Sequence, residues 1–309
     1  MLRLSIHVVC GEGGLVKIYL NIPEWDNRWI PYVYASLTGH SIVDNEQEAD
    51  VLLSMWMDPT VINWSHKYPD KLIITYCRRF ELWQREWLHQ MNWSAINSVI
   101  FVSKYYKKLF SRIFPDLTSI RKFIVPNGVD LQEWKLKSVP SKTKKIALVA
   151  STRWVKNFAL AFQILLELPK DYTLHLIGMG GGYEFTGIIS EYYQGLGLED
   201  RFFSHPQVKA TNVQDWLKDK EFILSCSYSE GNPNNVIEAM AMGIKPIVHL
   251  WPGARDQFPV NSLFRTVKEA VGKITDGNYT PHIYRDWACG KYSARNFDKI
   301  PQIIEACAC

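Results

Sequence analysis

The sequence has few cysteines and no long apolar run. No hydrophobic stretch approaches the roughly 18 residues that a membrane-spanning helix needs. The first residues, MLRLSIHVVCG, alternate like a strand and lack the layout of a secretory signal peptide. Only six cysteines occur, and Cys307 and Cys309 have no further cysteine or histidine near them in the sequence. We therefore expect free thiols and a cytoplasmic protein.

A strong charge of one sign is also missing. The 309 residues contain 35 Lys and Arg against 31 Asp and Glu, for a net charge of +4. This excess is too weak and too scattered to indicate a nucleic-acid partner, but it suits small anionic ligands. The basic segment YYKKLF (105–110) leaves two alternatives open: contact with the inner face of a membrane, or the solvated side of a helix.

Several catalytic motifs are absent. No Cys and His residues have zinc-like spacing, and no GxSxG segment indicates a nucleophilic serine. No GxGxxG follows a first strand, so the dinucleotide fingerprint is missing as well. No Asp-x-Asp pair occurs anywhere.

Alternating strands and helices dominate what remains. Such alternation predicts right-handed βαβ units and parallel sheets, an α/β class with two Rossmann-like halves. The expected strands are 2–9, 49–56, 71–77, 98–103, 123–130, 145–151, 173–178, 221–227 and 245–250. The expected helices include 80–96, one capped by Ser103, 157–169, 211–219, 234–243 and 262–275.

The polar, aperiodic stretch 136–145 indicates a domain boundary. We predict an N-terminal domain over 1–138 and a second domain over 139–285. The remaining residues, 286–309, are predicted to contain a terminal helix.

One stretch, SCSYSEGNPNNVIEAMAMGIKPIVHL (225–250), combines a strand, a glycine turn, a helix and a second strand. Asn234 or Asn235 is expected to cap the helix, whose N-terminus suits an anion. Glu230 precedes this helix and Glu238 lies about one turn inside it. Carboxylates suit vicinal hydroxyls because they accept two hydrogen bonds. The alternative is a helix with two solvated glutamates.

SEGNPNNVIEAMAMGIKPIV resembles the donor-binding segment of retaining GT-B glycosyltransferases of family 4, within the glycosyl transferases group 1. FIVPNGVDLQEW, FVSKYYKKLF and IALVASTRWVKNFALAFQIL are similar to further segments of that family, so the resemblance covers about residues 98–260. It implies the GT-B fold, with two Rossmann-like domains that face a cleft. It also implies that the terminal helix returns to the N-terminal domain.

The resemblance implies roles for individual donor-site residues. Glu238 would bond the donor ribose and Glu230 would approach the sugar, while Arg153 and Lys156 would neutralise the diphosphate. Three more residues would present backbone groups to the sugar and phosphates: Gly231, Asn232 and Asn234. The family pattern is not followed throughout, since only two residues separate Arg153 from Lys156 and Asn157 stands where glycine is frequent. The alternative for Arg153 and Lys156 is a basic surface loop.

Further candidates are less specific. Gly178 and Gly180 would form a donor-side loop, for which a plain glycine turn is the alternative. Gly13 and Gly14 would line the acceptor side, although Pro23 and Pro31 interrupt the helix that should follow. Arg78 and Glu81 follow a strand and are acceptor-site candidates, or else a salt-bridged helix start.

The implied reaction moves a sugar from a nucleoside-diphosphate sugar to a hydroxyl of a saccharide or a lipid-linked saccharide, with retention of configuration. Without an Asp-x-Asp pair we expect neither a metal ion nor another cofactor. Two alternatives remain: a nucleotide-sugar-binding protein without transfer activity, and a GT-B sugar-nucleotide epimerase.

Overall fold

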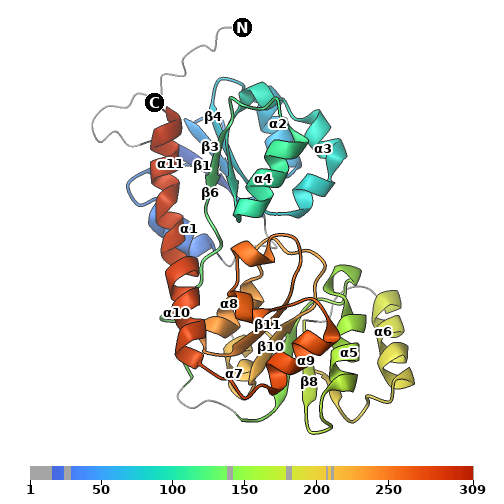
Figure 1. The fold of residues 1–309 in the computed structure, drawn as a ribbon. Coiled ribbons are helices and arrows are strands. Elements are labelled where there is room, and N and C mark those ends of the chain that lie inside the picture. Colours follow the sequence, from blue (N-terminus) through green and yellow to red (C-terminus); the bar gives the residue numbers. More distant parts are fainter. Residues whose placement is uncertain are drawn as a thin grey trace. The chain divides into compact units, whose positions relative to one another are not determined.

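Two units make up the chain, which we describe from a computed structural model. One unit contains residues 1–128 and 294–309, and the other residues 129–293. The structure describes residues 16–23, 29–137, 142–178, 183–206, 208–209 and 212–308. Within this part each unit has a six-stranded sheet whose strands all pair in parallel (Figure 1). The predicted α/β class is confirmed.

The division between the units differs from the predicted boundaries at 138/139 and 285/286. Val129 forms an isolated parallel bridge with Ser293, and its N–H donates to the carbonyl of Tyr292 at 2.6 Å. The chain passes between the units twice, at 128/129 and at 293/294, and this bridge joins the two residues of the second unit that lie at these crossings. Residues 286–293 therefore belong to the second unit, although they were predicted to belong with the terminal helix.

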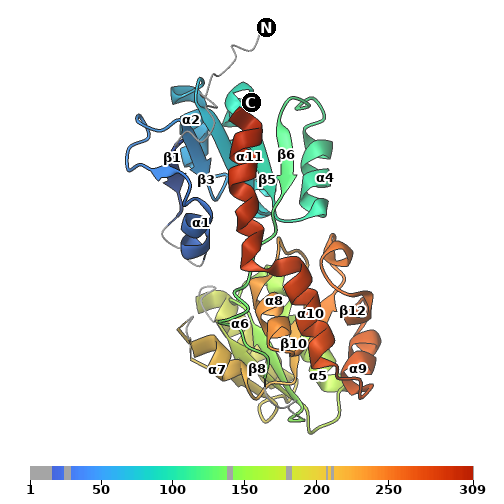
Figure 2. The same cartoon turned by 90° about the vertical axis from the view of Figure 1, so that its left-hand side faces the viewer.

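The first unit contains the sheet order β2-β1-β3-β4-β5-β6. Its strands are β1 Lys17–Asn21, β2 Ser41–Ile42, β3 Val51–Ser54, β4 Leu72–Cys77, β5 Ile96–Phe101 and β6 Arg121–Ile124. Its α-helices are α1 Ile30–Ser36, α2 Pro59–Lys67, α3 Arg85–Gln90, α4 Lys104–Ile113 and α11 Lys299–Ala308. Figures 1 and 2 show α1 and α11 on one face of this sheet and α2, α3 and α4 on the other.

The terminal helix α11 completes the core of the first unit. Ile300, Ile303 and Ile304 recur at helical spacing, and all three are buried in that core with Phe297. Pro301 lies in the first turn, where a missing N–H breaks no helical bond. A segment at the far end of the sequence thus covers a sheet built from residues 17–124.

The second unit has the order β12-β11-β10-β7-β8-β9. Its strands are β7 Lys145–Val149, β8 Thr173–Ile177, β9 Phe202–Ser204, β10 Phe222–Ser225, β11 Lys245–His249 and β12 Leu263–Phe264. Its α-helices are α5 Phe158–Glu167, α6 Tyr183–Gly195, α7 Val213–Leu217, α8 Asn234–Ala241, α9 Val267–Thr275 and α10 Pro281–Tyr292. Residues of α5, α6 and α9 form one core cluster, and residues of α7, α8 and α10 form another.

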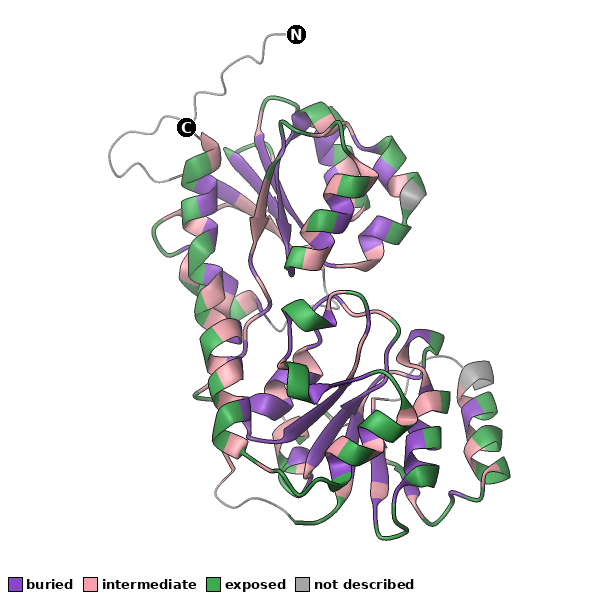
Figure 3. Cartoon of the chain, in the orientation of Figure 1, coloured by how far each residue is buried: buried purple, intermediate pink, exposed green. Residues whose placement is uncertain are grey.

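The strand orders place a topological switch point in each sheet. The chain leaves β7 in one direction toward β8 and β9, and later returns to place β10 on its other side. The equivalent position in the first unit lies between β1 and β3. Ligands of open α/β sheets bind outside the carboxyl ends of the strands at such points. The inner strands β4 and β10 are buried on both faces, as Figure 3 shows, so they form a rigid support.

Some local predictions were wrong. Residues 80–96 do not form one helix: two short 3₁₀ turns, Phe80–Trp83 and Trp93–Ala95, flank α3 because the backbone leaves helical conformation at Gln84 and Met91. The prediction missed α2, α6, α10, β1 and β9. Ser103 does cap α4, as expected, by accepting a bond from the N–H of Tyr106. The strand predicted at 2–9 lies outside the described residues.

Two histidines form a hydrogen-bonded pair at the β8–β9 edge of the second unit. His175 Nδ1 lies 3.0 Å from His205 Nε2, and its other ring nitrogen lies 2.9 Å from the hydroxyl of Thr173. Burial, with the charge of Lys220 and the nearby His205, lowers the pKa of His175 to about 4. Burial and Lys220 also lower the pKa of His205. Lys145 opposes protonation of both rings, while Asp219 favours it.

We predict that the free energy of unfolding falls as the pH drops from about 6.5 toward 4. In this window the unfolded chain binds protons that the folded pair excludes, so His175 alone accounts for a loss of roughly 3 kcal/mol. The His175→Gln/His205→Gln variant should lose less stability over the same window. Urea denaturation at several pH values measures the difference.

The matched control is His282→Gln, since His282 is exposed at the start of α10. It should keep the pH dependence of the parent. Equal pH slopes in the parent and the paired-histidine variant would contradict the prediction.

Candidate functional site

Two loops flank the switch point of the second unit. One follows β7 and contains a 3₁₀ turn, Trp154–Lys156; the other follows β10 and leads into α8. The N–H of Tyr228 in the second loop donates to the carbonyl of Val155 in the first at 2.9 Å. The neighbouring positions of β7 and β10 therefore bring together residues more than 70 positions apart in the sequence.

An ion pair connects these loops. The ammonium of Lys156 lies 2.6 Å from Glu230 Oε1, and the two side chains are only 14% and 12% exposed. The hydroxyl of Ser227 donates to the same carboxylate oxygen at 2.6 Å. The structure thus brings together two of the three predicted catalytic residues. Ser227, which also bonds the Glu230 carboxylate, was not predicted, because a serine in a loop carries no specific signal.

Arg153 stands at the start of the same 3₁₀ turn. Its side chain is exposed, and its Nε donates to the hydroxyl of Ser151 at 2.8 Å. Asn157 follows with a positive φ of 51°, and its side chain accepts a bond from the N–H of Leu160 to cap α5. Asparagine tolerates this left-handed conformation, which accounts for its occurrence where the resemblance suggests glycine.

The helix α8 begins differently from its predicted start. Neither Asn234 nor Asn235 is the N-cap: Pro233 holds that position, with no side-chain cap. Asn235 instead donates to the carbonyl of Val149 at 2.6 Å, which ties the first turn of α8 to the end of β7. Glu238 is partly exposed on the same helix.

A buried amide network supports the loop before α8. Asn232 donates to Gln257 Oε1 at 2.9 Å, and Gln257 donates to the carbonyl of Gly231 at 3.0 Å. The backbone carbonyl of Gln257 in turn accepts bonds from Trp287 and Tyr292 of α10. Asn232 therefore positions the loop through its side chain. Gln257 was not predicted, because nothing near it in the sequence indicates a role.

Of the two donor-side glycines, the structure describes Gly178. Its φ is +101°, and a Cβ there would lie 3.2 Å from the backbone of Ala150. Only glycine meets both conditions without strain. Gly180 lies outside the described residues, as do Gly13 and Gly14 of the first unit.

Arg78 and Glu81 are buried in the first unit, at 4% and 0% exposure. The guanidinium of Arg78 lies 4.0 Å from the ring centroid of Trp29, donates from Nε to the carbonyl of Met55, and donates to Asn127 Oδ1 at 2.6 Å. The carboxylate of Glu81 accepts bonds from the backbone N–H groups of Arg78 and Arg79. Burial raises the pKa of Glu81, and these N–H groups oppose the rise. In this arrangement both side chains shape the loop after β4.

A polar cluster marks the switch point of the first unit. Asn21 Nδ2 at the end of β1 donates to Ser54 Oγ at the end of β3, at 3.0 Å, and to Asp58 Oδ2 at 3.2 Å. The other oxygen of Asp58 caps α2. This cluster was not predicted, because β1 itself was not predicted.

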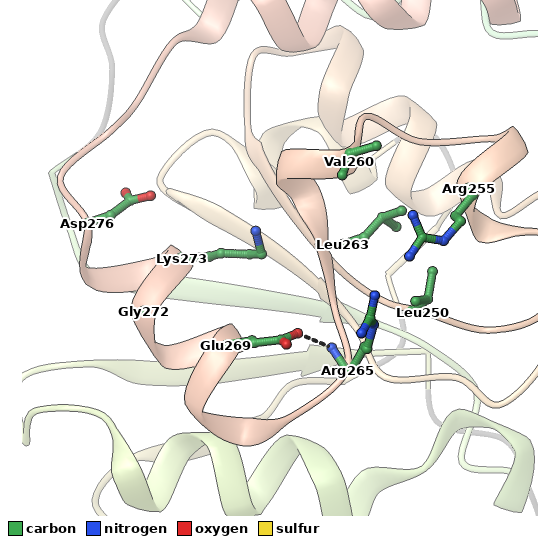
Figure 4. A pocket seen from close by; sticks show the side chains of 9 residues that line it. All are labelled: Leu250, Arg255, Val260, Leu263, Arg265, Glu269, Gly272, Lys273 and Asp276. Atoms are coloured by element: carbon green, nitrogen blue, oxygen red, sulfur yellow. Dashed lines mark hydrogen bonds between the residues drawn. The ribbon is translucent and has the colours of Figure 1, made fainter.

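A pocket of about 420 Å³ lies elsewhere on the second unit (Figure 4). It is lined by Leu250, Arg255, Val260, Leu263, Arg265, Glu269, Gly272, Lys273 and Asp276. Figure 4 shows the two arginines near one end and Asp276 at the other, with Glu269 bound to the N–H of Arg265. None of the predicted site residues lines this pocket.

Two features are absent from the described residues. No group of three or more His, Cys, Asp or Glu side chains there is arranged to bind a metal ion. Within the same part of the chain, no helix has the length and hydrophobicity needed to cross a bilayer.

Comparison with known proteins agrees with this architecture. Residues 132–262 match the family model described as "Glycosyl transferases group 1". HepE of Anabaena, solved in complex with UDP-glucose, is similar with a TM-score of 0.77 and 14% identity, over 94% of this chain and 100% of that one. No curated protein sequence matches the chain.

Two further structures are similar at 14% identity. Sucrose-phosphate synthase from Thermosynechococcus elongatus gives a TM-score of 0.71 over 93% of this chain and 80% of that one. A glycosyltransferase from Rickettsia africae gives 0.71 over 94% and 98%. The likenesses establish the GT-B fold. The family match is limited to residues 132–262, which include the loops after β7 and β10.

We predict that Lys156→Ala lowers the free energy of unfolding by about 1–3 kcal/mol. The substitution leaves the carboxylate of Glu230 charged, nearly buried and short of one partner. The effect should stay below that of a fully buried pair, because both side chains keep some solvent contact. The Lys156→Ala/Glu230→Ala variant should recover part of the loss. Urea denaturation of the parent, Lys156→Ala, Glu230→Ala and the double variant measures this coupling.

Lys144→Ala provides the matched control. Lys144 pairs with Asp171, but these side chains are 46% and 56% exposed, so water screens the pair and the change should be clearly smaller. If the Lys156→Ala variant is as stable as the parent, the ion pair contributes nothing to the free energy of unfolding, and the prediction is wrong.

Proposed function

We propose that the protein transfers a sugar from a nucleoside-diphosphate sugar to a hydroxyl acceptor, with retention of configuration and without a metal ion. The ion pair between Lys156 and Glu230 at the switch point is the observation that carries this proposal. It places a cation and a carboxylate within one segment that matches the group 1 glycosyltransferases. The UDP-glucose bound to HepE, which shares the fold, supports the same ligand class.

Arg153 and Lys156 would bind the diphosphate. As the glycosidic bond breaks, the leaving diphosphate gains negative charge, and cations already in place stabilise it. Arginine stays charged and can bind phosphate through two parallel hydrogen bonds. Lys156 is held by Glu230 at 2.6 Å, so its ammonium is oriented before a donor binds.

Glu230 and Glu238 would bind the hydroxyl-rich parts of the donor. Glu230 Oε1 accepts bonds from Lys156 and Ser227, which fixes the orientation of the carboxylate. Glu238 lies on α8, about one turn beyond the loop that carries Glu230. From the loop into the helix, the order would be the donor sugar at Glu230, the phosphates at the start of α8 and the ribose at Glu238.

Retention would follow from attack on the face that the diphosphate leaves. The leaving phosphate oxygen would accept the acceptor's proton, so no separate carboxylate base is required. The two positive side chains would perform the charge stabilisation that a metal ion provides in other transferases.

We predict that one nucleoside diphosphate among UDP, GDP and ADP raises the unfolding temperature of the parent. At 100 times its dissociation constant a ligand adds about 2.7 kcal/mol to the stability of the native state. Glu238→Ala and Arg153→Ala should each weaken binding by about 10–100-fold, since each removes a hydrogen bond to or from a charged group. A thermal-shift panel with titration of each ligand measures this.

Glu191→Ala and Arg112→Ala are the matched controls, because both side chains are exposed and lie outside the proposed site. They should bind the nucleotide like the parent. If none of the three nucleotides stabilises the parent at millimolar concentration, the donor site is refuted.

With the donor known, we predict that EDTA leaves the transfer rate unchanged within about twofold, and that the product keeps the anomeric configuration of the donor. The first outcome follows if Arg153 and Lys156 replace a metal. Proton NMR of the product determines the configuration. An inverted product, or activity that EDTA abolishes and Mg²⁺ restores, would refute these parts of the mechanism.

A further inference from the structure

Two large aromatic side chains are exposed beside the ion pair. Trp154 is 71% exposed and Tyr228 is 50% exposed, although rings of this size normally contribute 150–250 Å² each to a core or an interface. Each is two residues from a member of the pair, Trp154 from Lys156 and Tyr228 from Glu230. Apolar groups that gather on a surface in this way mark binding sites.

The two rings come from different loops and meet. Their centroids are 6.2 Å apart and their planes differ by 33°, so together they form one tilted aromatic surface. The hydrogen bond from the N–H of Tyr228 to the carbonyl of Val155 fixes the loops to each other, and Val155 is itself buried. The surface is therefore held in place by the scaffold before any ligand binds, which lowers the entropy cost of binding.

Three of the proposed donor-site residues are far less exposed than the rings, whereas Arg153 is exposed beside Trp154. Asn232 is 8% exposed, and the side chains of Glu230 and Lys156 are 12% and 14% exposed. The two rings are several times more accessible than any of these groups. A donor held by the inner residues would leave the rings available to the molecule that arrives from solvent.

The chemistry of the rings identifies what that molecule presents. Aromatic faces are apolar and carry a negative quadrupole, so they attract weakly positive C–H groups. One face of a pyranose ring is a flat array of such C–H groups, while its hydroxyls point outward to polar partners. Trp and Tyr have no charge to select an anion. A neutral sugar ring therefore fits this surface.

We infer that Trp154 and Tyr228 form a platform on which a neutral saccharide ring of the acceptor stacks. This inference rests on the proposed function, since it places the acceptor beside the donor sugar at Glu230. It narrows the acceptor to a molecule with a pyranose unit next to the reacting hydroxyl. Neither residue would take part in bond breaking; both would position the acceptor.

The test uses neutral saccharide probes on the full chain. Methyl glucoside, methyl galactoside, maltose, cellobiose and lactose are titrated in the presence of a saturating concentration of whichever of UDP, GDP and ADP binds the parent. Binding is followed by saturation-transfer NMR and intrinsic fluorescence. The Trp154→Ala/Tyr228→Ala variant should bind the best probe at least tenfold more weakly than the parent. Trp154→Phe, which keeps an aromatic face, should retain most of the affinity. The affinity for the same nucleotide is measured on every variant, because general damage to the loops lowers both the saccharide affinity and the nucleotide affinity.

Trp83→Ala is the matched control, since Trp83 is 54% exposed in the first unit. It should bind the probes like the parent. The inference is overturned if no probe binds the parent, if the double variant binds unchanged, or if Trp83→Ala loses as much. Failure of UDP, GDP and ADP alike to bind the parent would refute the donor site instead, and saccharide binding that still depends on the two rings would then support the platform alone.

Discussion

The ion pair between Lys156 and Glu230 is the interaction on which the second unit's site depends. It connects the loop after β7 to the loop after β10, on either side of the switch point where the strand order reverses. Because the pair is nearly buried, its charges interact more strongly than on an open surface, and neither side chain is free to move away at low cost. The ammonium, the carboxylate and the two aromatic rings beside them all take their positions from this junction.

Buried amides hold this junction from behind. Gln257 bonds Asn232 and the carbonyl of Gly231, and its own backbone carbonyl accepts bonds from α10. Asn235 connects the start of α8 to the last residue of β7. These groups need not contact a ligand to affect the site. If one of them moves, the binding residues that it supports move with it, and a displacement of about 1 Å is enough to disturb the geometry of a site. The first unit has a comparable arrangement, in which Arg78 and Glu81 brace the loop after β4.

Much of the fold could be predicted from the sequence. FILS and LIITYC are continuous apolar runs, which parallel strands buried on both faces require, and FALAFQILLE has the spacing of a helix with one buried face. The missed elements carry weak local signals. β9 has three residues, and β1 alternates poorly because only Ile18 is buried. The cap of α8 was misassigned because Asn235 satisfies a carbonyl of β7, a demand that arises only when the two segments are adjacent.

The sequence by itself determined the fold class, the alternation of strands and helices, and the segment from Ser225 to Leu250 that carries both glutamates. Those features depend on local hydrophobic pattern and turn chemistry, which neighbouring residues encode. Only the tertiary structure decided that Lys156 pairs with Glu230, that Trp154 meets Tyr228 and that Gln257 supports Asn232. The first two contacts join residues 74 positions apart and exist because β10 lies beside β7. Strand order depends on the packing of helices into both core clusters of the sheet at the same time. No single segment of the chain contains that information.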